Sequence, residues 1–593
     1  MSPYRLLICF AVAVGLLGSF SFGCRSFDGL AHVPRAVTGI FHRQPPNSDL
    51  AEEAADPAQV AKLSVESVSL TDKRPSTDQT TDDQAVALTE ATLASWATLT
   101  DEQLSDTVRA EAWQGYHREL KALLDHLMKT QQLDPTQPIL LSDSDQSFKS
   151  IRIQLHGFAW EAQDLNRFEF ATGKIHTQTK QDSKLARYWQ QPGLGIPLVA
   201  LRIREQTGSY HSRVVPFSAT AILRPTSSHR VAQVSKSSEI AVLDLYNPLS
   251  SYQAKLGNRE HQMCRDLSAP LAHVASDTHR SKIRDFMTPE HQHSGVGLRM
   301  LEPYQAGKIP VVFIHGLLSD RLTWIDLIND LRVTPWVNDR YQIWSYQYPT
   351  GQSYLRSGAE LRTALRQAMD DIDPEQTDPA LSAMVLIGHS MGGLLTKLQI
   401  CSSNSAIWNS IATRPVAHLN ASESVKRTIN EMFFFEPQPF VTRAIFIGTP
   451  HLGSVWASSA VGRLGSTLVH QPKDRVIALH HLIKNNPHVF VDQVHERLPT
   501  SIDLLRPDSP LLLATYPLPL ATHVKTHSII GTGKTLKNDV PADGVVSVKN
   551  AEHPHTLSEQ YIETTHTHLP DHPQTTEEVT RILSKHLLEF DAS

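Results

Sequence analysis

The chain has 593 residues, of which 40% are hydrophobic and 20% are charged. This composition is typical of globular proteins and excludes a wholly disordered, collagen-like or polytopic membrane protein, and the length allows two to four domains at roughly 150 residues each. The 55 basic and 61 acidic residues give a net charge of −6 without a long basic run, so the charge pattern gives no support for nucleic-acid binding.

Residues 1–24 have the pattern of an export signal. Arg5 precedes an apolar run at 6–23 that holds no charged residue. The run ends in Ser21-Phe22-Gly23-Cys24, which resembles the lipobox of bacterial lipoproteins, with Ser21 at a position where that pattern usually has leucine. We therefore expect Cys24 to be lipidated and to hold the chain at the membrane. An uncleaved membrane anchor and a cleaved secretory signal are the alternatives, and both also export the chain.

Two contrasting segments follow this leader. Residues 25–84 are rich in Pro, Ser, Thr and acidic residues without sustained periodicity, and we predict a disordered linker there. Residues 85–135 are predicted to be helical, because apolar side chains recur at intervals of three and four residues. This stripe, which we expect to pack on a neighbouring domain, consists of Leu120, Leu123, Leu124, Leu127 and Met128.

Residues 140–290 are predicted to form a β-rich accessory domain. Apolar and polar side chains alternate at 151–156 and 199–204, and further strand-like runs lie at 214–223 and 239–245. A sandwich is one candidate architecture for such a set of strands. We find no catalytic spacing of residues in this part of the chain.

The pattern changes at about residue 296, where short apolar runs begin to alternate with helical stretches. A continuous apolar run is typical of a strand that is buried on both faces of a parallel sheet. The candidate strands lie at 311–314, 341–346, 384–387, 444–447 and 528–530, and a helix is predicted at 353–372. We therefore predict an α/β domain with a doubly wound, mostly parallel sheet over residues 296–593.

The strongest motif of this region is Gly388-His389-Ser390-Met391-Gly392, which directly follows the apolar run at 384–387. A G-x-S-x-G sequence between a strand and a helix is typical of a nucleophile elbow, in which the glycines let the two elements approach closely. The serine then occupies a strained turn that projects its hydroxyl into the site. We predict that Ser390 is a nucleophile.

The predicted strand at 311–314 ends in a His-Gly-Leu turn. A serine nucleophile in this context needs two backbone N–H donors for the oxyanion, one from the residue after the serine and one from the loop after an earlier strand. We assign these donors to Met391 and Leu317. The neighbouring residues that we expect to contact the substrate are His315, Gly316 and His389.

The serine also needs a base and an orienting acid, in the chain order Ser, Asp or Glu, His. Asp543, which precedes Gly-Val-Val beyond the strand at 528–530, is the candidate acid. We expect the base in the loop between the last strand, at about 560–564, and the terminal helix. This loop holds both His566 and His568, and spacing alone does not separate them.

These motifs resemble those of bacterial α/β-hydrolase-fold esterases and lipases, including the triacylglycerol lipase-like and inositol-deacylase-like branch. The resemblance covers about half of the chain, from about residue 296 to 590. The matching segments are Pro310-Val-Val-Phe-Ile-His-Gly-Leu, Gly388-His-Ser-Met-Gly-Gly, Gly448-Thr-Pro-His-Leu-Gly-Ser, Ser501-Ile-Asp-Leu-Leu-Arg-Pro-Asp-Ser-Pro, His527-Ser-Ile-Ile-Gly and Asp543-Gly-Val-Val. The resemblance implies that Ser390 is the nucleophile, His566 the general base and Asp543 its orienting acid, and that the segment around Gly448 lines the site.

We therefore expect an exported, membrane-tethered serine hydrolase, a carboxylesterase or lipase, that acts on an ester or lipid-like small molecule without a metal or organic cofactor. The histidines at 553–572 match no known metal-ligand spacing, so we predict no metal site. The same triad would also permit amide hydrolysis or acyl transfer. A further alternative is a catalytically silent scaffold whose accessory domain binds a cell-envelope partner.

Overall fold

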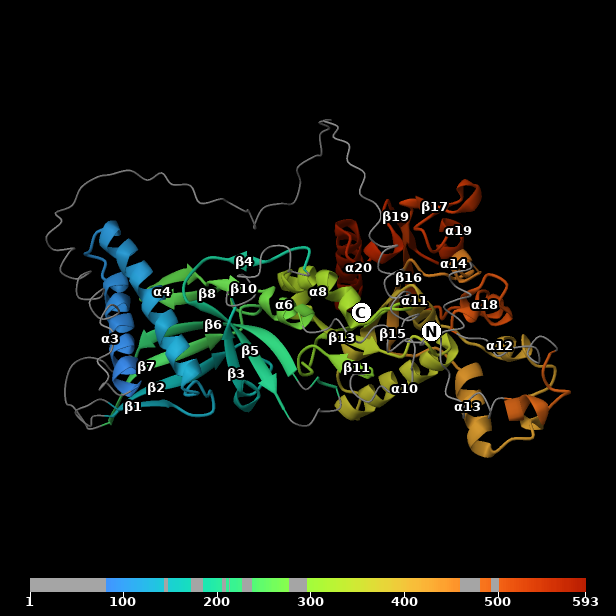
Figure 1. Ribbon diagram of the computed structural model, residues 1–593, viewed down its shortest axis with the longest axis horizontal. Helices are drawn as coiled ribbons and strands as arrows, with labels where there is room; N and C mark the ends of the chain where they lie inside the picture. Colours follow the sequence, from blue (N-terminus) through green and yellow to red (C-terminus); the bar gives the residue numbers. More distant parts are fainter. Residues whose placement is uncertain are drawn as a thin grey trace, which may run out of the picture. The chain divides into compact units, whose positions relative to one another are not determined.

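A computed structural model describes residues 81–142, 148–171, 185–204, 210–212, 214–226, 237–276, 296–458, 480–491 and 501–592 (Figure 1). The predicted leader, its Cys24 and most of the predicted linker lie outside these residues. Within the described ranges, no helix combines the length and the apolar character that crossing a bilayer requires.

The helical region predicted at 85–135 consists of two helices, α3 (Thr81–Thr100) and α4 (Asp106–Lys129). They are separate because Ser105 caps the start of α4, where its hydroxyl accepts a hydrogen bond from the N–H of Val108. All four leucines of the predicted stripe are buried, and Met128 is partly buried against the same core.

The accessory domain contains one six-stranded sheet in the order β1-β2-β7-β6-β5-β3. Strands β2 and β7 are parallel, and the other neighbours are antiparallel. The strands are β1 (Ile139–Ser142), β2 (Phe148–His156), β3 (Arg167–Phe170), β5 (Ile196–Ile203), β6 (Val214–Pro225) and β7 (Ser237–Tyr246). The smaller elements are η1 (Ala162–Asp164), β4 (Gln190–Gln191), β8 (Gln253–Leu256), β9 (Arg259–Gln262), β10 (Arg265–Asp266) and α6 (Ala269–Ser276).

A sandwich is the wrong architecture for this domain: among its described residues, helices rather than a second large sheet cover the apolar face. Side chains of α3, α4 and the sheet share one hydrophobic core. The buried Tyr116 of α4 is bonded to the sheet: its hydroxyl donates to the carbonyl of Leu223, 2.9 Å away, and accepts from the N–H of Leu223 at 3.0 Å. The helices and the β-rich region therefore form one structural unit.

The C-terminal region contains a seven-stranded sheet in the order β11-β13-β12-β14-β15-β16-β19. Strand β11 is antiparallel to β13, and all other neighbours are parallel, as the continuous apolar runs predict. The strands are β11 (Gly297–Met300), β12 (Ile309–Ile314), β13 (Tyr341–Gln347), β14 (Met384–His389), β15 (Val441–Ile447), β16 (Lys525–Gly531) and β19 (Ser558–Ile562), and β17 (Lys534–Thr535) and β18 (Pro541–Ala542) form a separate pair.

Successive residues of the central strands belong to opposite cores. Val312 and Ile314 of β12 pack in one core with helices α10 and α11, whereas Val311 and Phe313 pack in the other with α8 and α20. Helices therefore cover both faces of the sheet, as a doubly wound α/β fold requires. The helices are α8 (Ile325–Arg332), α9 (Pro335–Arg340), α10 (Tyr354–Ile372), α11 (Met391–Lys397), α12 (Ala406–Asn409), α13 (Glu423–Phe433), α14 (Val455–Ser458), α18 (Pro510–Thr515), α19 (Val548–Ala551) and α20 (Pro573–Asp591). The 3-10 helices are η2 (Arg321–Trp324), η3 (Leu381–Ala383), η4 (Val416–His418), η5 (Asp503–Leu505), η6 (Lys537–Asp539) and η7 (His566–His568).

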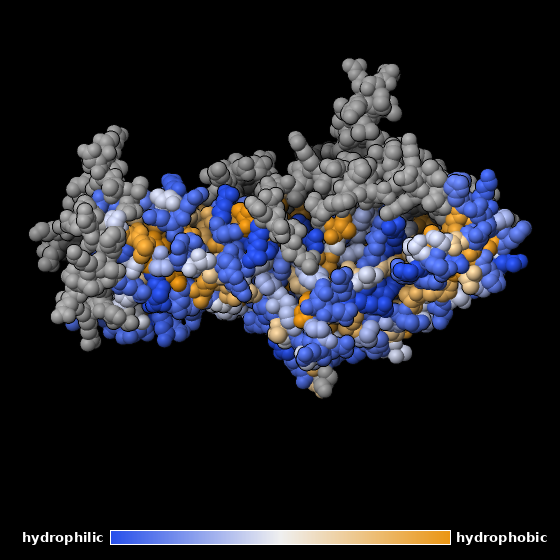
Figure 2. All heavy atoms as spheres, turned by 90° about the horizontal axis from the view of Figure 1, so that it is seen from below, coloured by the Kyte–Doolittle hydropathy of each residue, from blue (hydrophilic) through white to orange (hydrophobic). Residues whose placement is uncertain are grey.

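The face drawn in Figure 2 is dominated by hydrophilic residues, with apolar areas between them. The exposed large apolar side chains come from separate elements, such as Leu140 of β1, Leu513 of α18 and Leu588 of α20. Apolar residues scattered singly over a surface are ordinary, and they do not by themselves mark a binding site.

Helix α20 carries the buried His586, which ties it to two strands. The imidazole Nδ1 lies 3.0 Å from the hydroxyl of Tyr341 in β13, and Nε2 lies 3.0 Å from the hydroxyl of Thr442 in β15. Burial, together with the positive charge of Arg443, lowers the pKa of His586 to about 4. The folded protein therefore holds this histidine neutral in mildly acidic solution.

We predict that this histidine makes the protein sensitive to acid. The pKa of His586 is lower when folded than its ordinary value of 6.5, so its contribution to stability is complete above about pH 6.5 and is lost as the pH falls towards 4. Replacing it by a side chain that does not titrate, His586→Asn, should reduce the dependence of the unfolding free energy on pH in this window by up to about 1.4 kcal/mol per pH unit.

Urea denaturation at pH 4.5 to 7.5 measures this slope. The control is His568→Asn, since the side chain of His568 is 70% exposed. Equal slopes for His586→Asn and the parent chain would contradict the prediction.

Candidate functional site

The chemical groups predicted from the sequence lie beyond the carboxyl ends of neighbouring parallel strands. Leu317 follows β12, Ser390 follows β14, and the segment that begins at Gly448 follows β15. Asp543 lies beyond β16, and His566 follows β19. Because the strands are parallel, these ends lie along one edge of the sheet, where open α/β sheets bind their ligands.

Ser390 occupies a strained turn between β14 and α11. Its φ of 54° and ψ of −124° lie in a region that L-residues rarely adopt, at a cost of about 1–3 kcal/mol. The N–H of Ser390 donates to the carbonyl of Ile447 in β15 over 2.9 Å, which anchors the turn to the next strand. The serine side chain does not cap α11, so its hydroxyl is not committed to that helix.

The turn fits only because two backbones pass very close to each other. A Cβ atom at Gly392 would lie 2.2 Å from the carbonyl oxygen of Ile314 at the end of β12. No side chain can occupy such a position without displacing the backbone. The second glycine of the motif therefore holds the start of α11 against the neighbouring strand.

Asp543 and His566 form a buried pair. The Nδ1 atom of His566 lies 2.6 Å from Oδ2 of Asp543, and the N–H of His566 also donates to the carbonyl of Asp543 over 2.9 Å. The other carboxylate oxygen accepts hydrogen bonds from the N–H groups of Val545 at 2.9 Å and Val546 at 2.7 Å. The carboxylate is thus oriented on both sides, and the hydrogen bond to Asp543 leaves the Nε2 atom of His566 as the atom available to act as a base.

The structure distinguishes the two histidines that the spacing left open. His566 is 7% exposed and lines the same cavity as Ser390. The side chain of His568 is 70% exposed, and its Nδ1 atom lies 3.4 Å from the carboxylate of Asp571. Only His566 of these two is brought to Asp543.

The two predicted oxyanion donors are positioned differently. Met391 is the first residue of α11, where a backbone N–H has no partner within the helix. Leu317 is partly buried and lines the cavity beside Ser390. A Cβ at the preceding Gly316 would be 2.9 Å from the Cβ of Ser390, so the loop that carries Leu317 passes directly beside the serine.

His389 borders the cavity beside Ser390, as expected, and it also makes a hydrogen bond within the site. Its Nε2–H donates to the carbonyl of His566 over 3.0 Å, and the two rings are 4.8 Å apart. Burial lowers the pKa of His389 well below its ordinary value, and the charge of His566 lowers it further, so the ring is neutral. Although His389 borders the cavity, its hydrogen bond supports the loop that carries His566.

The expectation that His315 and Gly316 contact the substrate is corrected by the structure. His315 is fully buried and stacks on Tyr348 with ring centroids 4.4 Å apart, while the Tyr348 hydroxyl donates to the His315 carbonyl. Neither residue is among those that line the cavity. His315 packs the end of β12, and Gly316 provides the room for the loop beside Ser390.

The cavity has a volume of about 610 Å³, within the range of small-molecule sites. Ser390, His389 and His566 lie in its wall. Most of the remaining wall is apolar, and it includes Leu317, Leu318, Leu322, Ile325, Val545 and Val546. Pro450 and Ser454, from the Gly448 segment, also line it. The arrangement places a hydroxyl and an imidazole beside a space that suits an apolar group.

A second cavity, of about 550 Å³, lies in the accessory domain between Trp96 and strands β6 and β7. Its lining residues include no serine, cysteine or histidine. Its buried carboxylate, Asp244, is already bonded to Arg224 at 2.6 Å and to His156 at 2.8 Å. The cavity at Ser390 is therefore the candidate site for chemistry.

Sequence reasoning missed several residues of this site. The paired N–H groups of Val545 and Val546 follow an Asp-Gly turn, whose aspartate commonly accepts hydrogen bonds from the next residues of the chain, so a local signal was present. Ala275 and Asp326, which also line the cavity, had no such signal because they come from segments without a catalytic pattern. Among the described residues, no group of three or more His, Cys, Asp or Glu side chains could hold a metal ion.

No protein-family profile matches this chain, and no curated protein matches it. Solved structures of bacterial enzymes resemble about half of it. A lipase of Bacillus licheniformis in its mature form is 18% identical, with 49% of this chain and 99% of that chain covered and a TM-score of 0.28. The Staphylococcus hyicus lipase is 13% identical, with 48% and 96% covered and a TM-score of 0.29.

A putative aryl esterase from Burkholderia cenocepacia is 15% identical, with 49% and 95% covered and a TM-score of 0.25. These matches are to bacterial lipases and esterases, the same group that the motifs resemble.

Proposed function

We propose that this chain is a serine hydrolase that cleaves carboxylic esters through an acyl-enzyme. The observation that carries the proposal is the convergence of Ser390, in its strained turn, and the buried Asp543–His566 pair on one cavity. This combination of a serine at an elbow turn, an oriented imidazole and an acid is the general arrangement of nucleophilic acyl transfer.

In this mechanism Nε2 of His566 removes the proton of the Ser390 hydroxyl, and the serine oxygen attacks the ester carbonyl. The N–H groups of Leu317 and Met391 stabilise the negative charge that develops on the carbonyl oxygen. His566 then protonates the leaving alcohol, and water hydrolyses the acyl-enzyme with the same histidine as base. Asp543 accepts the Nδ1–H throughout and stabilises the imidazolium.

The cavity wall supports an apolar acyl or alkyl group as part of the substrate. Leu317, Leu322 and Ile325 offer apolar contact next to Ser390, and the burial of each CH₂ group on such a wall is worth about 0.8 kcal/mol. Esters with an apolar chain should therefore bind more tightly than acetate esters.

The first prediction from this proposal is that Ser390→Ala abolishes turnover of p-nitrophenyl esters. The expected loss in kcat is on the order of 10⁴-fold or more, because a triad acts as a unit. A fluorophosphonate probe should label the wild-type protein and not the variant. The matched control is Ser382→Ala, since Ser382 is an exposed serine of η3 in the same domain. A wild-type protein that neither hydrolyses esters nor accepts the probe would refute the proposal.

The second prediction concerns the acid and the base. Asp543→Asn should lower kcat by a factor on the order of 10⁴, because an amide in place of the carboxylate favours the wrong tautomer of His566. His566→Ala should be about as damaging as the loss of the serine. His568→Ala should keep wild-type activity. The reverse order for the two histidines, measured with the same esters, would show that the base is misassigned.

We further propose that the protein is exported and held at the membrane by a lipid on Cys24, an assignment that rests on the leader sequence alone. The third prediction is therefore that a bacterial host expressing the full chain incorporates labelled palmitate into the wild type but not into Cys24→Ser. Without its acyl chains, Cys24→Ser should leave the membrane fraction. A variant that stays membrane-bound without label would favour the uncleaved anchor instead.

A further inference from the structure

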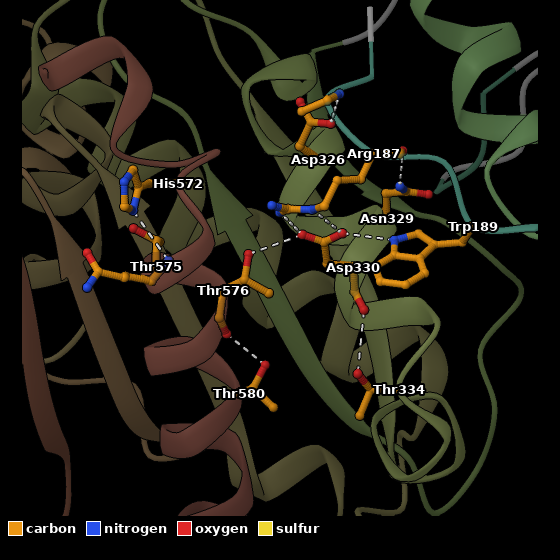
Figure 3. A network of polar contacts seen from close by, with 12 residues as sticks. Arg187, Trp189, Asp326, Asn329, Asp330, Thr334, His572, Thr575, Thr576 and Thr580 are labelled. Atoms are coloured by element: carbon orange, nitrogen blue, oxygen red, sulfur yellow. Dashed lines mark hydrogen bonds and ion pairs between the residues drawn. The ribbon is translucent and has the colours of Figure 1, made fainter. Parts of the chain in front are cut away.

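The accessory domain makes a dense polar contact with α8 of the α/β domain (Figure 3). The guanidinium of Arg187 forms two hydrogen bonds to the carboxylate of Asp330, one of them from Nε at 3.0 Å, and the indole N–H of Trp189 donates to the same carboxylate over 2.9 Å. The side-chain amide of Asn329 donates to the carbonyl of Arg187 over 3.0 Å, and the N–H of Ala186 donates to Asp326 over 2.7 Å.

The helix held by these contacts is also a wall of the candidate active site. Asp326 and Ile325, in the first turn of α8, line the cavity with Ser390, as does Leu322 just before the helix. The bond from Ala186 thus ends on a residue of the cavity wall. A shift of α8 away from the accessory segment would move this wall.

Helix α6 adds a direct contribution from the accessory side. Ala269, at its start, packs with Val199 and Leu201 of the accessory sheet. Ala275, near its end, packs in the core of the α/β domain and lines the cavity. One short helix therefore joins the accessory sheet to the wall of the site.

Asp330 connects a third element to this contact. The hydroxyl of Thr576, in the first turn of α20, donates to Asp330 over 3.3 Å, and Figure 3 shows this threonine on the opposite side of the carboxylate from Trp189. Helix α20 begins directly after the loop that carries His566 and Asp571, which also line the cavity. The buried Asp330 thus bonds the accessory segment, α8 and α20 at one point.

The positive charge of Arg187, in the accessory segment, stabilises the carboxylates on and beside α8. Asp326, Asp330 and Asp571 are three carboxylates that interact electrostatically, and Arg187 is the cation that partly compensates them. Burial raises the pKa of Asp326, and the nearby carboxylates of Asp571 and Asp330 raise it further. The hydrogen bond from the N–H of Ala186 acts in the opposite direction and lowers this pKa. Loss of Arg187 would leave the buried Asp330 without its cation, which is a costly arrangement.

We infer that the accessory domain determines which esters this site accepts. Its segment 185–189 holds α8, which forms one wall of the cavity, and its residue Ala275 completes that wall. This inference rests on the proposed function and extends it: the accessory domain is part of the binding site for the apolar group of the substrate. Arg187 and Asp330 act as positioning residues, and Ala275 contacts the substrate.

The test compares kcat/KM for p-nitrophenyl acetate with kcat/KM for the longest p-nitrophenyl ester that the full wild-type chain hydrolyses. Ala275→Leu fills part of the cavity and should lower the ratio of long to short ester about tenfold. Arg187→Gln should lower the same ratio at least threefold, through KM for the long ester, since α8 is no longer held in place.

The ratio within one sample is insensitive to partial unfolding, because unfolded protein reduces both activities equally. The matched control is Arg152→Gln, which removes an exposed ion pair with Glu239 elsewhere in the accessory domain. If Ala275→Leu does not fold, Ala275→Val makes the same test with a smaller side chain. If the variants at Arg187 and Ala275 both give the same long-to-short ester ratio as the control, the inference about the accessory domain is overturned, but the proposed hydrolase activity stands. If the wild type neither hydrolyses esters nor accepts the fluorophosphonate probe, the inference and the proposed function are both overturned.

Discussion

The structure of the candidate site depends on one steric constraint, the crossing of three backbones at the carboxyl ends of β12, β14 and β15. Gly392 lies against the end of β12 with no room for a side chain, and Ser390 is bonded to the end of β15. This crossing forces the positive φ of Ser390. The surrounding parallel sheet supplies the packing energy that sustains such a strained residue.

The sequence predicted the α/β region well because its signals are local. Continuous apolar runs mark the strands that are buried on both faces, and the elbow motif, the Asp-Gly turn and the terminal helix lie where the pattern placed them. The accessory domain was predicted less well. Alternation at 151–156 shows that one face of a strand is buried, but it does not reveal whether a second sheet or a pair of helices covers that face.

The site itself was predictable only in part, for physical reasons that differ from residue to residue. His566 and His568 are two positions apart in one loop, and only the three-dimensional course of η7 directs the first towards Asp543. His315 belongs to a motif beside the serine, yet it stacks on Tyr348, a residue from another strand end. The contacts of Arg187 with Asp330 join residues 143 positions apart, and no periodic pattern encodes such a pair.

The order of the strands also has a consequence for synthesis of the chain. The accessory sheet and its helices α3 and α4 are complete before the first strand of the α/β sheet is made, so this part can fold first as the chain emerges. Ser390 follows in the middle of the second sheet, whereas Asp543 and His566 belong to strand ends that are made last. A growing or truncated chain that ends before β19 therefore holds Ser390 and Asp543 without His566, and brings these three side chains together only in its final stage of folding.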